Sequence, residues 1–181
     1  TPLDRDETLS EKAYAQLRSA LVGGRLVPGQ KLVHRQLAKE LGVSPTPVRE
    51  ALLRLVSEGA LELDARGIAW VPRLAPDRYA EIMELRIMLE GQAAAEAARW
   101  ATAADVARLA AIHARLMQAR REGDGPVLLA ENERFHFGVI AIARMPVLRR
   151  VVETLWTQAG PTISLLSTIP RPISPNGHPH D

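Results

Sequence analysis

The strongest constraint on the fold is a pair of short helical segments separated by a brief turn, each with its own start and stop signals. The first, residues 34–41, ends at Gly42, a residue suited to a left-handed C-cap. The second begins at Ser44, which can cap the helix, has two prolines in its first turn, and ends at Gly59. Its apolar residues follow one helical stripe: Val48, Ala51, Leu52, Leu55 and Val56. Two helices joined so closely predict a helix-turn-helix.

The flanking residues predict a winged form of this unit. Thr8 and Glu11 have the spacing of a capping box and start a helix that stops at Gly23. After the second segment, the runs LELD and IAWV are β-type and are joined by Ala65-Arg66-Gly67, which predicts a hairpin. The sequence therefore indicates an N-terminal winged helix-turn-helix.

The remainder of the chain has helical periodicity and no strand signal. We expect four helices between Asp77 and about Ser167, with Gly160-Pro161 kinking or dividing the last. The predicted fold is mainly α. It has an arm at 1–9, a winged helix-turn-helix at 10–73, and an antiparallel all-α helical bundle at 74–181. Among the residues expected to be buried in the bundle are Leu85, Val106 and His113.

Composition and charge narrow the functional classes. The 181 residues include no cysteine, which excludes disulfides and thiolate chemistry, and no apolar run approaches the roughly 20 residues that span a bilayer. The first ten residues do not have the pattern of a secretory signal, so we expect a cytoplasmic protein without membrane contact. Residues 12–54 hold eight basic and two acidic side chains, whereas 74–181 balance. This asymmetry favours a surface for a polyanion.

The basic segment contains the residue types that read duplex DNA. A helix can enter the major groove, and an arginine there can bond bidentately to guanine, so Arg49 is our candidate for base contact. We expect Ser44 and Thr46 to contact phosphates or base edges, and Arg35 to contact the backbone or groove. Arg66 and Gly67, at the tip of the wing, would contact the neighbouring groove.

Residues 14–71 resemble the DNA-binding domain of the GntR family of bacterial transcription regulators. The resemblance is in PGQKL, LAKELGVSPTPVREAL and the spacing L..EG.L. It implies that Arg35, Ser44, Thr46, Arg49 and Gly67 match positions that contact operator DNA. Two residues depart from the pattern. Pro45 replaces a common arginine, which removes one familiar DNA contact, and Val33 replaces a common capping serine, which should weaken that helix start by about 1 kcal/mol.

The helical half resembles the FCD effector domain of the FadR-like subfamily, through ELRIMLEGQAA (84–94) and ENERFHFGVIAIA (131–143). Asn132 and His136 lie four residues apart on an otherwise apolar stripe, which fits either metal ligands or a hydrogen-bonded core histidine. The resemblance implies a divalent metal at these two residues, with His180 as a third ligand and His178 less favoured. We predict Zn, with Ni or Mn as alternatives. The helix expected to supply a fourth ligand lies beyond Asp181, so the domain is expected to be incomplete.

Arg86 lies on or beside the buried face of its helix, where a cation needs an anionic partner. Glu90, one turn away, is the simplest partner. The resemblance implies instead that Arg86 faces an effector cavity and binds a small carboxylate.

These observations predict a regulator that responds to a ligand and is not an enzyme. It would act as a repressor and bind a palindromic operator as a homodimer, with a small carboxylate effector, a metal or both in the helical domain. Two alternatives remain. One is a metal-dependent enzyme acting on small acids, although the sequence has no nucleophile elbow, phosphate loop or HExxH motif. The other is a non-specific nucleic-acid binder.

Overall fold

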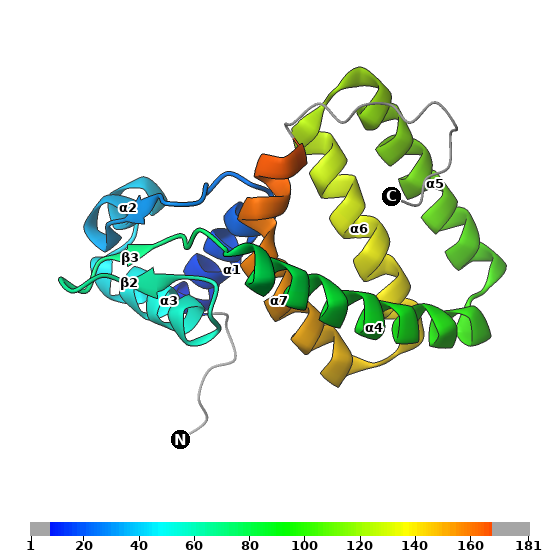
Figure 1. Ribbon diagram of the computed structural model, residues 1–181, viewed down its shortest axis with the longest axis horizontal. Coiled ribbons are helices and arrows are strands. Elements are labelled where there is room, and N and C mark those ends of the chain that lie inside the picture. The colour runs from blue at the N-terminus through cyan, green and yellow to red at the C-terminus, as the bar shows by residue number, and fades with distance from the viewer. Residues whose placement is uncertain (1–7, 168–181) are drawn as a thin grey trace.

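The computed structural model describes residues 8–167, and Figure 1 shows two packed units. The N-terminal unit, called the head below, contains α1 (Leu9–Val22), β1 (Lys31–Leu32), α2 (His34–Leu41), α3 (Pro45–Ser57), β2 (Glu62–Leu63) and β3 (Ala69–Trp70). The C-terminal unit, called the body, contains α4 (Pro76–Trp100), α5 (Ala103–Glu122), α6 (Gly125–Ala143) and α7 (Pro146–Ser167). This arrangement confirms the predicted fold class.

The head is a winged helix-turn-helix, as the sequence predicts. Its antiparallel sheet has the order β1-β3-β2, so the predicted hairpin of β2 and β3 gains β1, which sequence reasoning missed. The apolar stripe of α3 packs against α1, and Val48 and Leu55 are fully buried. The sheet contributes Leu32, Ala69 and Val71 to the same core. This packing leaves the opposite face of α3 in solvent.

The helix ends follow their sequence signals with one exception. Thr8 and Glu11 form the predicted capping box, Thr102 and Asp105 form a second, and Gly42 ends α2 with a φ of 67°. Val33 starts α2 without a side-chain cap, as expected. Ser44 is the N-cap residue of α3, but its side chain makes no capping hydrogen bond. Its expected capping role is therefore wrong.

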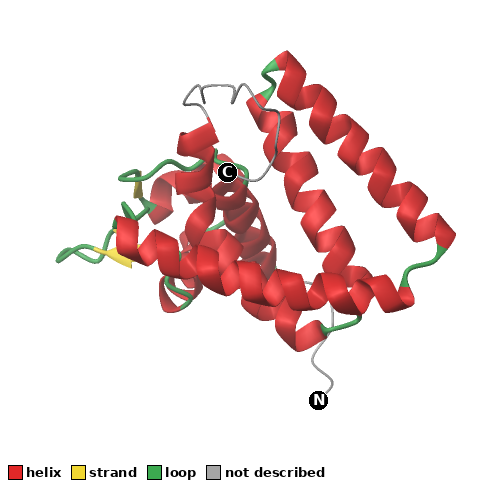
Figure 2. Cartoon of the chain, turned by 45° about the vertical axis from the view of Figure 1, so that its right-hand side comes forward, coloured by secondary structure: helices red, strands yellow, loops and turns green. Residues whose placement is uncertain are grey.

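The body is entirely helical among its described residues, and Figure 2 shows the strands confined to the head. Helix α6 packs against α4, α5 and α7. Three expectations for buried residues are wrong, because these helices pack through other faces. Leu85 is 37% exposed, Val106 is 57% exposed, and His113 is exposed beside Phe135. The buried residues of α5 are instead Ile112 and Ala119. Pro161 does not divide the last helix, since α7 continues through it to Ser167. No described helix has both the length and the apolar character needed to cross a membrane.

The two units meet where α1 crosses α7 (Figure 1). Gly160 allows this close approach, because a Cβ there would lie 2.7 Å from both Leu21 O and Val22 Cα. Polar contacts add to the crossing. Gln158 Nε2 donates to the Glu58 carbonyl oxygen at 2.9 Å, and Arg78 reaches the Gly59 carbonyl oxygen at 3.2 Å. The head is therefore anchored to the body through its first helix and the end of α3.

Candidate functional site

The exposed start of α3 brings together the polar residues predicted to contact DNA. Ser44, Thr46 and Arg49 are all exposed, while Pro47 and Val48 between them are buried against the head core. The Ser44 hydroxyl is not used in capping, so it is available to an external partner. The prolines at the first and third helical positions have no N–H, so Thr46 carries the only N–H among these three residues. Anion binding at this end must therefore depend on side chains more than on the backbone.

The arginines of α3 divide into one structural and one unpaired residue. Arg54 donates to Glu58 at 3.1 Å, and its Cζ lies 3.7 Å from the centre of the Tyr14 ring, so it belongs to the contact between α3 and α1. Arg49 makes no hydrogen bond or ion pair with any other described residue. An exposed guanidinium with no intramolecular partner keeps all its donors for a ligand. The structure thus singles out Arg49, as the sequence does.

The wing tip and α2 add two more exposed cations. Asp64 Oδ1 accepts from the backbone N–H groups of Arg66 and Ile68, both at 2.9 Å, which fixes the turn. Gly67 has a φ of 75°, a left-handed conformation that favours glycine. Arg66 and Arg35 are exposed, and their side chains make no hydrogen bond or ion pair with described residues. All six residues predicted to contact DNA are therefore accessible on the head.

The body contains a buried polar cluster around Glu90. Arg86 Nε donates to Glu90 Oε1 at 2.7 Å, and the Arg86 guanidinium lies 4.0 Å from the Trp156 ring centre. Trp156 Nε1 donates to the same oxygen at 3.0 Å, and His136 Nδ1 contacts Glu90 Oε2. Burial alone would raise the pKa of Glu90. Hydrogen bonds from His136 and Arg86, together with their charges, outweigh burial and lower this pKa to about 2.

One of the contacts of this cluster is local along the chain, and the others are not. Arg86 is buried, with 6% exposure, and pairs with Glu90, the simplest partner that its position predicted. Sequence reasoning did not place Trp156 or His136 beside them. No sequence signal could have done so, because Trp156 is 66 positions from Glu90 along the chain. Since Glu90 and Trp156 already engage its guanidinium, Arg86 is not a free cation.

The predicted metal ligands are only partly present among the described residues. No group of three His, Asp or Glu side chains in 8–167 is placed to hold an ion. His136 contacts Glu90 through Nδ1, which leaves Nε2 as its possible metal donor, with Asn132 one turn away on α6. His180 and His178 lie outside the described residues. The described side chains alone therefore do not complete a metal site.

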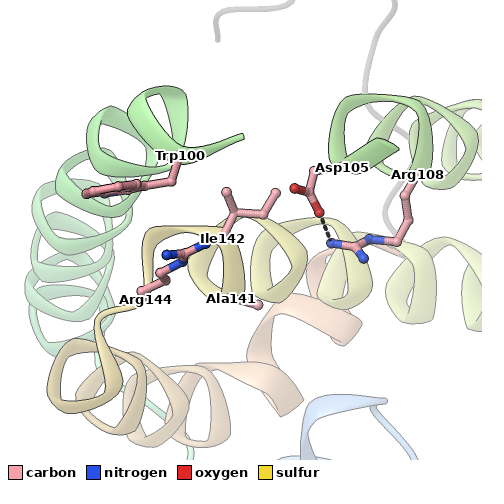
Figure 3. A pocket seen from close by; sticks show the side chains of 6 residues that line it. All are labelled: Trp100, Asp105, Arg108, Ala141, Ile142 and Arg144. Carbon is pink, nitrogen blue, oxygen red and sulfur yellow. Dashed lines mark hydrogen bonds and ion pairs between the residues drawn. The ribbon is translucent and has the colours of Figure 1, made fainter. Parts of the chain in front are cut away.

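A separate small hollow lies where α4, α5 and α6 meet. It has a volume of about 180 Å³, and Figure 3 shows its lining residues. The Arg144 guanidinium lies 5.3 Å from the Trp100 ring centre, and Arg108 is paired with Asp105 at 2.8 Å. The charged groups of this hollow are paired or open to solvent, so none of them requires a charged ligand.

Comparison with known proteins gives two matches that divide the chain as the structure does. Residues 9–69 match the family model described as bacterial regulatory proteins, gntR family, and residues 81–181 match the FCD domain. The HTH-type transcriptional regulator McbR of Escherichia coli K12 is 36% identical over 159 residues, which cover 88% of this chain and 72% of McbR. The gluconate operon transcriptional repressor of Bacillus subtilis is 40% identical over 88 residues, covering 49% of this chain and 35% of the repressor.

Solved structures agree with this division. The structure of E. coli McbR/YncC matches with a TM-score of 0.83 at 36% identity, covering 88% of this chain and 75% of that one. A putative regulator from Rhodococcus sp. RHA1 matches with a TM-score of 0.68 at 20% identity, covering 86% of this chain and 74% of that one, which supports the fold alone.

Proposed function

This chain belongs to the GntR family of bacterial transcription regulators and carries an FCD domain, and from that premise we propose that it is a repressor which binds a palindromic operator as a homodimer. The regulator function sets aside the enzyme that the sequence left open, because the matched families and relatives are regulators. The observation that carries the proposal is the exposed, unpaired Arg49 on the first turns of α3, beside the free hydroxyls of Ser44 and Thr46.

Operator binding can be tested directly with the full chain. The duplex from upstream of the chain's own gene is titrated against a scrambled duplex at two salt concentrations, because non-specific binding depends steeply on salt. We expect tighter binding to the upstream duplex. Arg49→Ala should reduce that preference by about 1 to 3 kcal/mol. Arg120→Ala removes an exposed arginine of the body, far from the head, and should leave the preference unchanged. Equal binding of both duplexes by the wild-type chain would refute the operator.

The homodimer is supported by apolar side chains that are exposed on α4 and α7. Leu85 and Met88 are 37% and 62% exposed on α4, and Val147 and Val151 are 66% and 47% exposed on α7. Each pair shares one helix face by its spacing, and the two helices pack together. Exposed apolar groups on adjoining helices are typical of an interface. A second copy is the occupant that an operator-binding head requires, since two recognition helices must reach major grooves about 34 to 36 Å apart.

Oligomeric state tests this surface. Met88→Glu and Val151→Glu place charges in it and should convert a dimer into a monomer in sedimentation experiments. Both side chains are exposed in the single chain, so each variant should still fold. A wild-type monomer at micromolar concentration, or dimeric variants, would refute this placement of the interface.

Control of the repressor would act in the body. We propose a small carboxylate effector that replaces Glu90 as the partner of Arg86, and a divalent metal, Zn with Ni or Mn as alternatives, held by Asn132, His136 and His180. The metal is supported by His136 Nε2, which makes no hydrogen bond to a described residue, and the carboxylate is supported by the buried Arg86. The metal site is tested by measuring the metal content of the wild type and of His136→Ala, and unchanged content would refute the site.

The effector site is tested by calorimetric titration of the wild type and of Arg86→Met with lactate and gluconate. An equal response in both proteins would refute the site.

A further inference from the structure

A cavity at the junction of head and body has no role in the proposed DNA or metal sites. Its volume is about 310 Å³, near the lower end of the roughly 300 to 1,000 Å³ typical of small-molecule sites. Helix α1 supplies one wall, and α6 and α7 supply the others. The lining residues are Arg18, Glu133, Arg134, Phe137, Arg149 and Glu153.

Two guanidinium groups in this cavity share one acceptor. Arg149 Nε donates to Glu153 Oε1 at 2.9 Å, whereas Arg18 Nη2 lies 3.8 Å from the same oxygen, too far for a hydrogen bond. Arg18 is only 25% exposed, and it makes no hydrogen bond to any described residue. Guanidinium groups from the head and the body therefore meet here, and they retain N–H donors that make no hydrogen bond to described residues.

One carboxylate in the cavity lacks a partner. Glu133 is half-buried, and it accepts no hydrogen bond and forms no ion pair within the described part of the chain. The carboxylate of Glu153 lines the same cavity. A carboxylate that is partly desolvated and faces a like charge would gain from a cationic hydrogen-bond donor.

These charges disfavour the simplest ligands. An inorganic anion would meet the arginines but also the carboxylates of Glu133 and Glu153, and a metal cation would meet three guanidinium groups. A zwitterion satisfies both sets, provided that its opposite charges are close together. The Phe137 ring adds an apolar wall to the cavity. The chemistry of the cavity is therefore complementary to an α-amino acid.

We propose that this cavity binds a free α-amino acid, with its carboxylate on Arg18 and Arg149, its ammonium group on Glu133, and its side chain against Phe137. The ligand would join α1 of the head to α6 and α7 of the body, and so favour one placement of the head. An effect on DNA binding rests on the regulator function proposed above, because only a ligand with different affinities for two placements shifts their populations. The binding itself does not depend on that function.

Calorimetry on the full chain tests the binding without DNA. Each of the common L-amino acids is titrated separately at pH 7, and the tightest is compared with its decarboxylated amine and its deaminated acid. We expect one or more amino acids to saturate below about 1 mM and both analogues to bind at least about tenfold more weakly. Failure of every amino acid to bind at about 10 mM, or analogues that bind as well as the amino acid, would overturn the proposal.

Variants locate the site. Glu133→Gln keeps the shape of the side chain and removes a partly desolvated charge, so the protein should fold and lose at least about tenfold in affinity. Arg149→Gln should do the same from the opposite side of the cavity. Glu96→Gln changes an exposed ion pair on α4 and serves as the control. If Glu133→Gln and Arg149→Gln bind like the wild type, the site is wrong. If an amino acid binds but does not change the affinity of the chain for the operator duplex, only the effect on DNA binding is refuted. If the chain does not bind the operator duplex even without the amino acid, the proposed operator is refuted and the amino-acid site is not.

Discussion

Replacing Glu90 by glutamine should strongly destabilise the body. The carboxylate is 13% exposed and accepts from Arg86 and Trp156 through one oxygen while it contacts His136 through the other. Folding lowers its pKa from 4.5 to about 2. At about 1.4 kcal/mol for each pKa unit, this fall corresponds to roughly 3 kcal/mol of stability at neutral pH. Glu90→Gln removes the charge and leaves Arg86 buried without its anion, a change of about the same size.

The pH dependence gives a second measure of the same interaction. A carboxylate whose pKa is lowered on folding stabilises the protein above its unfolded pKa, and this contribution disappears as the pH falls from about 4.5 towards 2. The stability difference between wild type and Glu90→Gln should therefore be largest at pH 7 and should shrink below pH 4. The measurement is urea unfolding, followed by the helical circular dichroism signal, at a series of pH values.

The matched control is Glu96→Gln on the same helix. Its partner, Arg99, is 74% exposed, so the loss should stay below about 0.5 kcal/mol. If Glu90→Gln unfolds within about 0.5 kcal/mol of the wild type at pH 7, the cluster does not contribute to stability as argued. The same conclusion would follow from a stability difference that does not change with pH.

Two further changes test the contact between the units and the core of the head. Gly160→Ala places a methyl group against the backbone of Leu21 and Val22, so we expect a loss of about 1 to 3 kcal/mol and faster hydrogen exchange in α1; unchanged exchange would contradict the close crossing. Burial and the hydrogen bond from Tyr14 to Glu58 raise the pKa of Tyr14 to about 12. Ultraviolet titration should show a tyrosine that ionises near pH 12, which disappears in Tyr14→Phe, and ionisation of both tyrosines of the chain near pH 10 would show this to be wrong.

The sequence predicted the head in detail because its signals are local. Capping residues, helix-ending glycines and the apolar stripe of α3 each act within a few residues of one another, so the start of α3 and its exposed arginine could be derived from spacing alone. The strand β1 was missed, because two residues carry no periodic pattern and pair only through the wing. The capping role of Ser44 was wrong, because the residue type permits that hydrogen bond without requiring it.

The body was predicted less completely. Its helices and their ends agree with the structure, but Leu85, Val106 and His113 lie outside the core expected for them. Periodicity shows that a helix has an apolar face, whereas the angle at which neighbouring helices pack decides how much of that face is covered. In alanine-rich helices the buried part of the surface is harder to predict, because small apolar side chains occur on both the buried and the exposed faces.

The sequence by itself determined the two-part architecture, the ends of most helices, and the exposed side chains at the start of α3. Only the tertiary structure decided which polar groups meet: Glu90 with His136 and Trp156, 46 and 66 positions away, and Arg18 of the head with Glu153 of the body. The physical reason is the distance along the chain over which each interaction acts. Caps and helical stripes depend on neighbours within one or two turns, whereas these polar clusters form only after whole helices have packed and have fixed which side chains leave solvent together.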